Sequence, residues 1–235
     1  SSSYGGALYS SSATYFLVES SSFFSCKTSD LYGGAIYFSN GQCVLYEICC
    51  YDCVSTYTGS SNTNGQCVYI IANNAASSKN YVVYSSFVRS VNDYSRSWFT
   101  VHLNYGNISC TSANISLHRC FGDTIYYHPF ANSNYVTCSI SYSSITDNIV
   151  PGYTCFYLPS GGAKHEIKSC NILRNKQGPN TQGTIAVWGN MMIEDSCILE
   201  NNATYVFYTS SSYRITISNC TVDSTSNNGY LITQN

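Results

Sequence analysis

Three nine-residue stretches share one pattern and decide the expected fold. They read ISYSSITDN at residues 140–148, IKSCNILRN at 167–175 and IEDSCILEN at 193–201. Each has Ile at its first and sixth positions, Ser or Cys at the fourth and Asn at the ninth. Ile residues set among short polar ones suit strands, and no apolar spacing of helical period is present. The three stretches therefore predict a repeated strand unit.

The pattern recurs along the chain. Five further copies begin at Val18, Ile48, Val83, Ile115 and Ile217, and the last has Thr in the Asn position. A second repeat, YGGALY at residues 4–9, returns as YGGAIY at 32–37. Units with two or three short strands cannot bury an apolar face alone, so successive units must stack. We therefore predict an all-β fold, a right-handed, single-stranded parallel β-helix (solenoid) of about eight coils, as one domain over residues 1–235.

Stacking of such coils places like residues in columns about 4.8 Å apart. We expect Asn148, Asn175 and Asn201 to form a ladder at one corner, with their amides bonded to the backbone and to one another. An immunoglobulin-like sandwich also has many short strands. However, a sandwich does not predict one pattern recurring in the same order along the whole chain.

Composition narrows the function classes. Hydrophobic residues make up 44% of the 235 residues, charged residues 9%, and the net charge is −2. This balance is not that of a disordered chain, and it offers no electrostatic attraction for nucleic acid. No apolar run approaches the length of about 18 residues that a membrane helix needs. The chain starts without Met or a signal peptide, inside repeat-like sequence, so we expect it to be a piece of a longer protein.

The GGAIYF segment at 33–38 and its partner at 5–10 resemble the repeats of polymorphic outer membrane proteins, a family of surface proteins. The Tyr-, Ser-, Asn- and Cys-rich style is more similar to the protist (trichomonad-like) versions than to the bacterial ones. Residues 65–68, GQCV, depart from the motif. The resemblance implies a β-helix at the cell surface or outside the cell, adhesin-like and without enzymatic activity.

Thirteen cysteines invite a metal or redox hypothesis. The densest group is Cys43, Cys49, Cys50, Cys53 and Cys67, with a Cys-x-x-Cys at 50–53. A zinc site needs a second such pair or nearby His ligands, which this stretch lacks, so we expect neither a metal nor another cofactor. Cysteine is also a compact apolar residue. We expect stacked free thiols facing inward, exemplified by Cys53, Cys120, Cys170 and Cys220; disulfides stay open for an extracellular protein.

The enzymatic alternative is a polysaccharide lyase or hydrolase, because such sites need paired carboxylates on one face. The best grouping is Lys164, His165 and Glu166 on one coil with Glu194 and Asp195 on the next. Aligned registers would bring Glu166 near Glu194 or Asp195. Charged residues at alternating strand positions are commonly a solvated face, so we assign no catalytic residue.

The outward tyrosines are the more suggestive feature. Tyr9, Tyr37, Tyr69 and Tyr126 are expected on the same strand of successive units, where a tyrosine ladder could contact a glycan or a protein. Such residues also suit any exposed strand. Four sequons are glycosylation candidates, at Asn107, Asn114, Asn202 and Asn219, and Asn202 sits at a predicted turn.

Three functions follow in order of preference. The first is a non-enzymatic adhesion or interaction module, cell-surface or extracellular, whose partner is a protein or glycan, with adjacent repeats of the same chain alongside. The second is the carbohydrate-active enzyme. The third is a structural spacer or assembly element.

Overall fold

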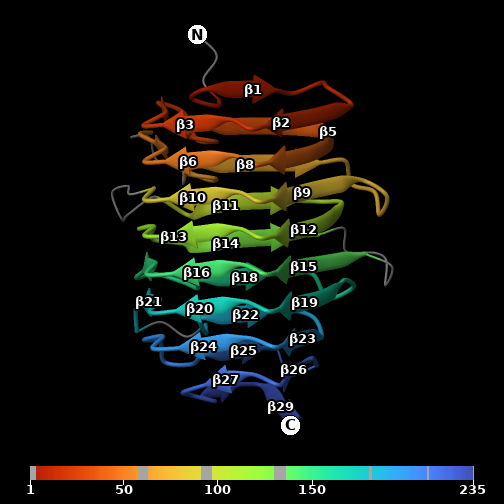
Figure 1. Ribbon diagram of the computed structural model, residues 1–235, viewed down its shortest axis with the longest axis vertical. Coiled ribbons are helices and arrows are strands. Elements are labelled where there is room, and N and C mark those ends of the chain that lie inside the picture. The colour runs from red at the N-terminus through yellow and green to blue at the C-terminus, as the bar shows by residue number, and fades with distance from the viewer. Residues whose placement is uncertain are drawn as a thin grey trace.

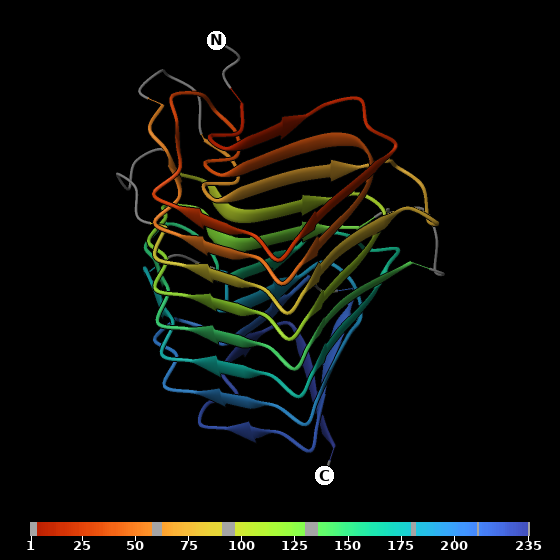
Figure 2. The same ribbon diagram turned by 45° about the horizontal axis from the view of Figure 1, so that its top comes forward.

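The computed structural model describes residues 4–57, 63–90, 97–129, 136–179, 182–210 and 212–234. The chain folds as a parallel β-solenoid whose coils stack from the N-terminal to the C-terminal end (Figures 1 and 2). Its regular elements are all strands, and every strand pairing is parallel. The described part contains no helix of the length and apolar character needed to cross a bilayer. The predicted all-β solenoid is confirmed, and the right-handed sense stays a prediction.

Each coil contributes a strand to three long ladders. The first ladder contains β1 (Leu8–Ser10), the start of β5 (Ile36–Tyr46), β8 (Val68–Ala72), β11 (Phe99–Asn104), β14 (Asp123–His128), β18 (Phe156–Leu158), β22 (Ile185–Val187), β25 (Phe207–Thr209) and β28 (Asn227–Asn228). The second contains β2 (Tyr15–Glu19), the end of β5, β9 (Lys79–Val83), β12 (Asn107–Thr111), β15 (Thr137–Ser141), β19 (Lys164–Lys168), β23 (Met191–Glu194), β26 (Arg214–Ser218) and β29 (Tyr230–Gln234).

The third ladder is an eight-stranded sheet. It contains β3 (Ser22–Phe24), β6 (Cys49–Tyr51), β10 (Ser86–Val88), β13 (Asn114–Ser116), β16 (Ser144–Thr146), β20 (Asn171–Leu173), β24 (Cys197–Leu199) and β27 (Thr221–Val222). Two short pairs follow it in some coils, β4 (Lys27–Thr28) with β7 (Val54–Ser55) and β17 (Ile149–Val150) with β21 (Lys176–Gln177). Eight passes through the third ladder correspond to about seven complete turns between the first and the last.

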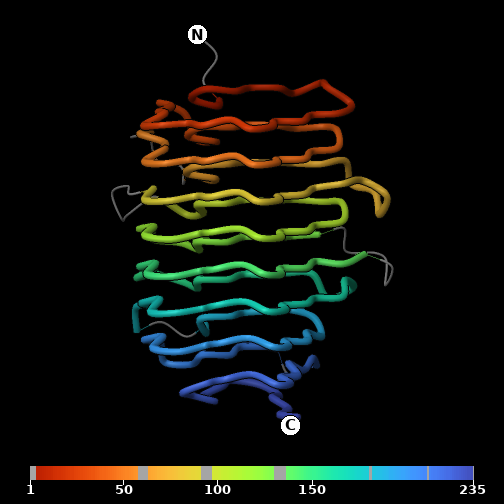
Figure 3. Tube along the Cα trace, in the orientation of Figure 1, coloured from red at the N-terminus to blue at the C-terminus, as the bar shows by residue number. Residues whose placement is uncertain are grey.

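The ladders stay in register although the coils differ in length. Along the first ladder, Val68 pairs with Val101, a step of 33 residues, whereas Ile185 pairs with Phe207, a step of 22. The tube trace shows even spacing of the coils with loops of different reach at the corners (Figure 3). The connections between strands therefore absorb the variation in length.

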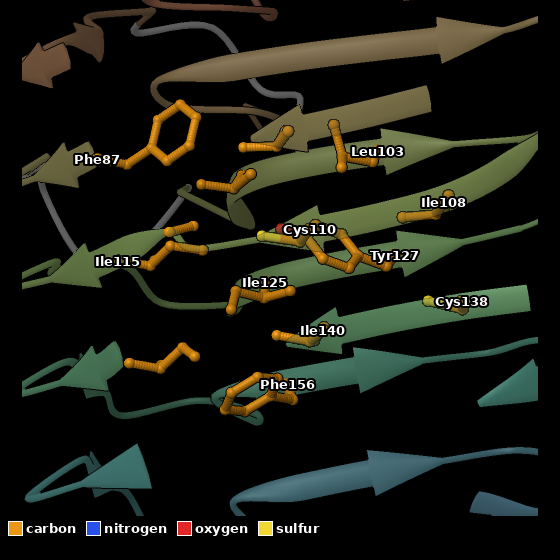
Figure 4. Close-up of a cluster of buried hydrophobic side chains, with 14 of the residues drawn as sticks. Phe87, Leu103, Ile108, Cys110, Ile115, Ile125, Tyr127, Cys138, Ile140 and Phe156 are labelled. Atoms are coloured by element: carbon orange, nitrogen blue, oxygen red, sulfur yellow. The ribbon is translucent and has the colours of Figure 1, made fainter. Parts of the chain in front are cut away.

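The core is a set of apolar columns inside the solenoid. Phe87 and Ile115 follow one another on the third ladder, and Cys110 and Ile140 on the second (Figure 4). Ile145 continues the column of Ile115. All five are fully buried. A unit that buries its side chains only against its neighbours explains why the apolar positions recur in every coil.

The register corrects three of the eight sequence copies. The copies beginning at Val18, Ile140, Ile167, Ile193 and Ile217 are aligned as predicted. The one placed at Val83 begins at Val82, because Val83 pairs with outward Thr111. The copies placed at Ile48 and Ile115 begin at Leu45 and Cys110, which occupy the column of Val82. In the frame that begins at Leu45, Ile48 itself occupies the Ser/Cys position, which concealed that frame.

The asparagine ladder at the third corner is confirmed. Asn148 and Asn175 each donate from Nδ2 to the Oδ1 of the next Asn in the ladder, at 2.9 and 3.0 Å. The backbone N–H groups of the same two residues donate to the same oxygens. Asn201 completes the series by donating to the carbonyl of Ile172. These bonds satisfy backbone groups that a buried corner would otherwise leave without partners.

Two corners of almost every coil use a residue in the left-handed conformation, with φ between 46° and 59°. Those after the second ladder are Ser20, Glu47, Tyr84, Ser112, Tyr142, Ser169, Asp195 and Asn219; those after the third are Ser25, Asp52, Arg89, Leu117, Asp147, Arg174 and Glu200. None is glycine, so each carries the steric cost of a Cβ in this region. The backbone N–H of Leu117, for example, bonds the carbonyl of Thr146 on the next coil and holds the bend.

The Gly-Gly-Ala motif has a separate geometric cause for each glycine. Gly33 has a φ of 65°, which favours glycine. At Gly34 the constraint is space, because a Cβ there would overlap the carbonyl oxygen of Gln66 on the next coil. The motif is therefore needed where two coils approach most closely ahead of the first ladder.

Candidate functional site

The outer face of the first ladder carries one aromatic ring per coil over six coils. We call the set Tyr9, Tyr37, Tyr69, His102, Tyr126 and Tyr157 the aromatic column. Successive ring centroids are 5.2, 5.6, 4.4, 4.6 and 5.5 Å apart. At about 4.8 Å per coil the column extends about 24 Å along the solenoid. The four tyrosines predicted from the sequence belong to this single structure.

The exposure of the column falls towards its middle. Tyr9 is 44% exposed, whereas Tyr69 is 9% and His102 5% exposed. Tyr37, Tyr126 and Tyr157 are half-buried. The expectation that Tyr69 is an open, outward residue is therefore wrong in one respect: it points outward, but neighbouring rings cover it. Tyr32 lies 4.6 Å from it on one side and His102 4.4 Å on the other.

Two members of the column, His102 and Tyr157, were not among the predicted residues, and His102 is not a tyrosine. Its ring lies 4.4 Å from Tyr69, 4.6 Å from Tyr126 and 5.2 Å from Phe99. Neither ring nitrogen has a hydrogen-bond partner among the described residues. Burial, together with the nearby His128, lowers the pKa of His102 to about 3, so the ring is neutral at physiological pH. Only the register, which pairs His102 with Tyr69 and Tyr126, reveals its membership.

Further aromatic side chains flank the column. Tyr4 and Tyr32 lie beside Tyr37 at one end, with ring centroids 5.0 and 6.2 Å away. At the other end Trp188 meets Tyr157 edge-on at 4.8 Å. None of the three lies in the repeated strand position, so the tyrosine pattern could not identify them. We call the aromatic column together with Tyr4, Tyr32 and Trp188 the aromatic wall.

The stacking limits what the wall can bind. Rings that are parallel to within 18° for Tyr9 and Tyr37, and 13° for Tyr37 and Tyr69, turn their faces towards one another. Faces in the middle of the column are then covered, and edges and hydroxyl groups point to solvent. The wall therefore offers hydrogen-bonding phenols and ring edges to a ligand, with open faces only towards its ends.

The acidic grouping of the enzymatic alternative is not assembled as expected. Glu166 pairs in register with Met192, not with Glu194 or Asp195. Its carboxylate forms an ion pair with Lys164, and those of Glu194 and Asp195 lie 3.3 and 3.9 Å from the amine of Lys168. The condition of aligned registers is not met, because Glu166 and Glu194 are offset by two residues along the strands.

The hollow beside this face also lacks a carboxylate. It has a volume of about 330 Å³ and is lined by Lys164, His165, Asn190, Met191, Met192, Arg214 and Thr216. His165 in its lining is buried and donates from Nε2 to the carbonyl of Ser160 at 2.7 Å. Burial lowers the pKa of His165 to about 4, which leaves a neutral imidazole. Paired acid and base groups for glycoside cleavage are not brought together here.

The dense cysteine group separates into an inner cluster and two unrelated residues. Cys50, Cys53 and Cys67 are buried together, with Cys26 beside Cys53 on the preceding coil. Hydrogen bonds from Cys50 and then Cys67 lower the pKa of Cys53, while burial raises the pKa of Cys67. The Cys53 thiol also lies 3.3 Å from the carbonyl of Phe23. The cluster is therefore a packed group of interacting thiols.

All thirteen cysteines are free thiols in the structure. Cys53, Cys120 and Cys170 are buried as predicted, and Cys220 is partly buried against the core. The two members outside the inner cluster are Cys43, in the core of β5, and Cys49, on the outer face of β6. Across the described residues, no three His, Cys, Asp or Glu side chains are arranged to hold a metal ion.

The four sequon asparagines differ in surroundings. Asn202 is exposed, and its backbone bonds Asn175 and Gln177 while its side chain stays outside those bonds. Asn219 is also exposed, but its Nδ2 donates to Asp195 at 2.7 Å. Asn107 and Asn114 are half-buried within strands, and their amides bond Thr137 and Ser86. Asn202 has the geometry that best suits a glycan, and its modification stays a prediction.

Comparison with family models, with curated proteins and with solved structures gave no match for this chain. The likeness of the Gly-Gly-Ala repeats to polymorphic outer membrane proteins therefore rests on the motif alone.

Proposed function

We propose that the chain is a non-enzymatic interaction module that acts at the cell surface or outside the cell and binds a protein or glycan through the aromatic column. The observation that carries the proposal is the aromatic column: six in-register rings over about 24 Å, partly open to solvent. Aromatic residues are enriched where proteins bind, because they offer a large rigid area together with polar groups.

The surroundings of the column support this choice. The net charge of −2 and the Ser-, Thr- and Asn-rich surface favour short-range contacts over electrostatic attraction. Exposed Asn202 within a sequon suits a secretory route. The Gly-Gly-Ala likeness to surface proteins points the same way, and that likeness is confined to residues 5–10 and 33–38.

Substitution of the open column members tests the proposal. The triple change of Tyr9, Tyr37 and Tyr126 to Ala should weaken binding on a glycan array or to host cells by about tenfold or more. The corresponding triple Phe variant keeps the rings and removes the hydroxyls, so it reports whether phenol hydrogen bonds contribute. The matched control changes Tyr15, Tyr84 and Tyr142, exposed tyrosines outside the column, to Ala. Equal binding by the Ala variant and the unmodified chain would rule out the column as the contact surface.

A structural spacer is the second candidate, and the covered rings of Tyr69 and His102 favour it. Stacked aromatic pairs contribute about 0.5–1.5 kcal/mol each beyond their buried area, so the column also ties the coils together. If the chain is only a spacer, the triple Ala variant should lose thermal stability. The unmodified chain should then either bind no ligand or bind it no better than the variant does. Melting temperature and binding, measured on the same preparations, separate the two functions.

A further inference from the structure

Tyrosine side chains gather at the N-terminal end of the aromatic column. Tyr4, Tyr9, Tyr32 and Tyr37 form what we call the N-terminal tyrosine cluster. Tyr37 is its centre: the ring centroids of Tyr4, Tyr9 and Tyr32 lie 5.0, 5.2 and 6.2 Å from that of Tyr37. Phenol rings held this close together by a rigid sheet can react with one another as well as pack.

Within the cluster, Tyr9 and Tyr37 are the pair whose positions are held by strand pairing. The residues are opposite each other in the parallel pairing of β1 with β5. Their rings are 18° from parallel at a centroid separation of 5.2 Å. Stacked rings at such a separation bring carbon atoms of the two edges to about van der Waals distance, roughly 4 Å. Opposite positions in a parallel pairing, with nearly parallel rings, are an arrangement in which the two phenol edges can meet.

From this geometry we propose that Tyr9 and Tyr37 are a site of oxidative cross-linking, which joins the first two coils through a dityrosine bond. The oxidant is a one-electron system of the haem-peroxidase class with hydrogen peroxide. Each phenol gives up one electron and one proton and becomes a phenoxyl radical. The radicals form a carbon–carbon bond between ortho positions, and the two displaced ring hydrogens return to the phenol oxygens. One peroxide is reduced to two waters for each bond formed.

Access and chemistry select this pair over the other members of the column. Tyr9 is 44% exposed, so an oxidant can reach it, whereas Tyr69 is almost covered. His102 interrupts the run of phenols, because an imidazole has no phenoxyl radical to offer. Beyond it, Tyr126 and Tyr157 are tilted by 45°, a poorer approach for their edges. The modification is independent of the ligand of the column, because it needs only the two rings and an oxidant.

Peptide mapping tests the cross-link on the whole chain. The folded protein is treated with peroxidase and hydrogen peroxide, then reduced, alkylated and digested with trypsin. Cleavage after Lys27 separates residues 1–27 from residues 28–79, so the two peptides stay joined only through a new covalent bond. The expected product is the joined peptide pair, lighter than the sum of its parts by two hydrogens, with dityrosine fluorescence and fragment ions that place the bond at Tyr9 and Tyr37.

Single Tyr→Phe variants make the assignment specific, because Phe keeps the stacked ring and removes the reactive phenol. Tyr9→Phe should lower the yield of the joined peptide at least several-fold. Tyr15→Phe, at an exposed tyrosine in the same tryptic peptide, and Tyr4→Phe should leave the bond at Tyr9 and Tyr37 in place. The proposal is overturned if Tyr9→Phe retains the joined peptide. It is also overturned if joining occurs only between molecules, shown by a yield that rises with protein concentration and by covalent dimers on a denaturing gel.

Discussion

His118 and Asn148, on consecutive coils, make the same two hydrogen bonds to the coil before them. Asn148 accepts the backbone N–H of His118 at Oδ1 and donates from Nδ2 to the carbonyl of Ile115. His118 accepts the backbone N–H of Ser90 at Nδ1 and donates from Nε2 to the carbonyl of Phe87. The imidazole of His118 thus occupies one position of the asparagine ladder and makes the hydrogen bonds that a carboxamide makes elsewhere. This arrangement fixes the neutral tautomer with its proton on Nε2.

Replacement of His118 should separate the hydrogen bonds from the titration. Burial lowers the pKa of His118 from 6.5 to about 4. The neutral ring therefore contributes stability that is full above pH 6.5 and is lost as the pH falls towards 4. His118→Asn should retain most of the stability at pH 7.5 and lose less than the unmodified chain between pH 6.5 and 4. His118→Leu should be less stable than the unmodified chain at pH 7.5 and also between pH 6.5 and 4, because leucine makes neither hydrogen bond. Urea unfolding midpoints across this range provide the measurement.

The asparagine ladder predicts a large cost at its centre. Asn175→Ala removes the acceptor of the Asn148 amide and the donor to the carbonyl of Ile145, both inside the buried corner. Leaving such groups without partners costs about 1–3 kcal/mol each, so a loss of about 3 kcal/mol is expected from chemical denaturation. Asn171→Ala, at an exposed position of the adjacent strand β20, is the control and should change stability little. Equal losses in the two variants would show that the ladder contributes nothing special.

The ladder was predictable, and His118 within it was not. Asn148, Asn175 and Asn201 end three unambiguous copies of the repeat, so spacing alone placed them in one column. A copy that begins at Ile115 puts His118 in the Ser/Cys position, whereas the true frame of this coil starts at Cys110, a residue unlike the Ile at the head of other copies. The repeat frame is hard to recognise wherever a different residue makes the same hydrogen bonds or fills the same space, as His118 does for Asn and Cys110 for Ile.

The aromatic wall also has one part that could be predicted from the sequence and one part that could not. The tyrosines Tyr9, Tyr37, Tyr69 and Tyr126 follow from alternation within strands. The cover over Tyr69 does not, because Tyr32 reaches it from a loop ahead of the neighbouring strand. The sequence left open whether Glu166 and Glu194 are aligned, because a two-residue offset along a strand cannot be seen until the register is known.

The second glycine of the Gly-Gly-Ala motif should tolerate no side chain. In Gly34→Ala the new Cβ would overlap the backbone carbonyl of Gln66 and approach Val54, so two coils would have to separate. A loss of about 2–4 kcal/mol is expected, similar to other severe packing changes. Gly161→Ala is the matched control, since its Cβ would press on the movable hydroxyl end of the Tyr213 side chain and make only an ordinary contact with the backbone, at the carbonyl of Trp188. Thermal melting of both variants measures the difference, and an unchanged Gly34→Ala would contradict the close approach.

The contribution of Asp123 to stability should be larger in mild acid than near neutrality. Its carboxylate accepts hydrogen bonds from the N–H and hydroxyl of Thr154, but burial raises the pKa of Asp123 from 3.8 to about 7. The contribution of this group to stability is full below pH 3.8 and is lost as the pH rises to about 7. Asp123→Asn keeps the acceptor oxygen and removes the ionisation. The variant should gain on the order of 2 kcal/mol at pH 8 relative to the unmodified chain and gain little at pH 4.

Leu117 offers a stabilising change. Its φ of 59° places a branched side chain in the left-handed region, and the side chain is 51% exposed, so little packing compensates for the strain. Leu117→Gly should raise the free energy of unfolding by about 1 kcal/mol. The control, Leu173→Gly in strand β20, should lower it, because glycine in a strand loses entropy without relieving strain. A lower melting temperature for Leu117→Gly would show that its side chain packs better than its exposure indicates.

The unequal steps between coils have a consequence for how such a chain can change over time. Val101 follows Val68 after 33 residues and Phe207 follows Ile185 after 22, yet both pairs lie in one uninterrupted ladder. Insertions and deletions at the corners leave the columns aligned, whereas exchange of a column residue disturbs the coils above and below it. Related chains should therefore diverge in length at their corners long before they diverge in the identities of their asparagine and aromatic positions, and alignments that penalise gaps uniformly will underestimate their kinship.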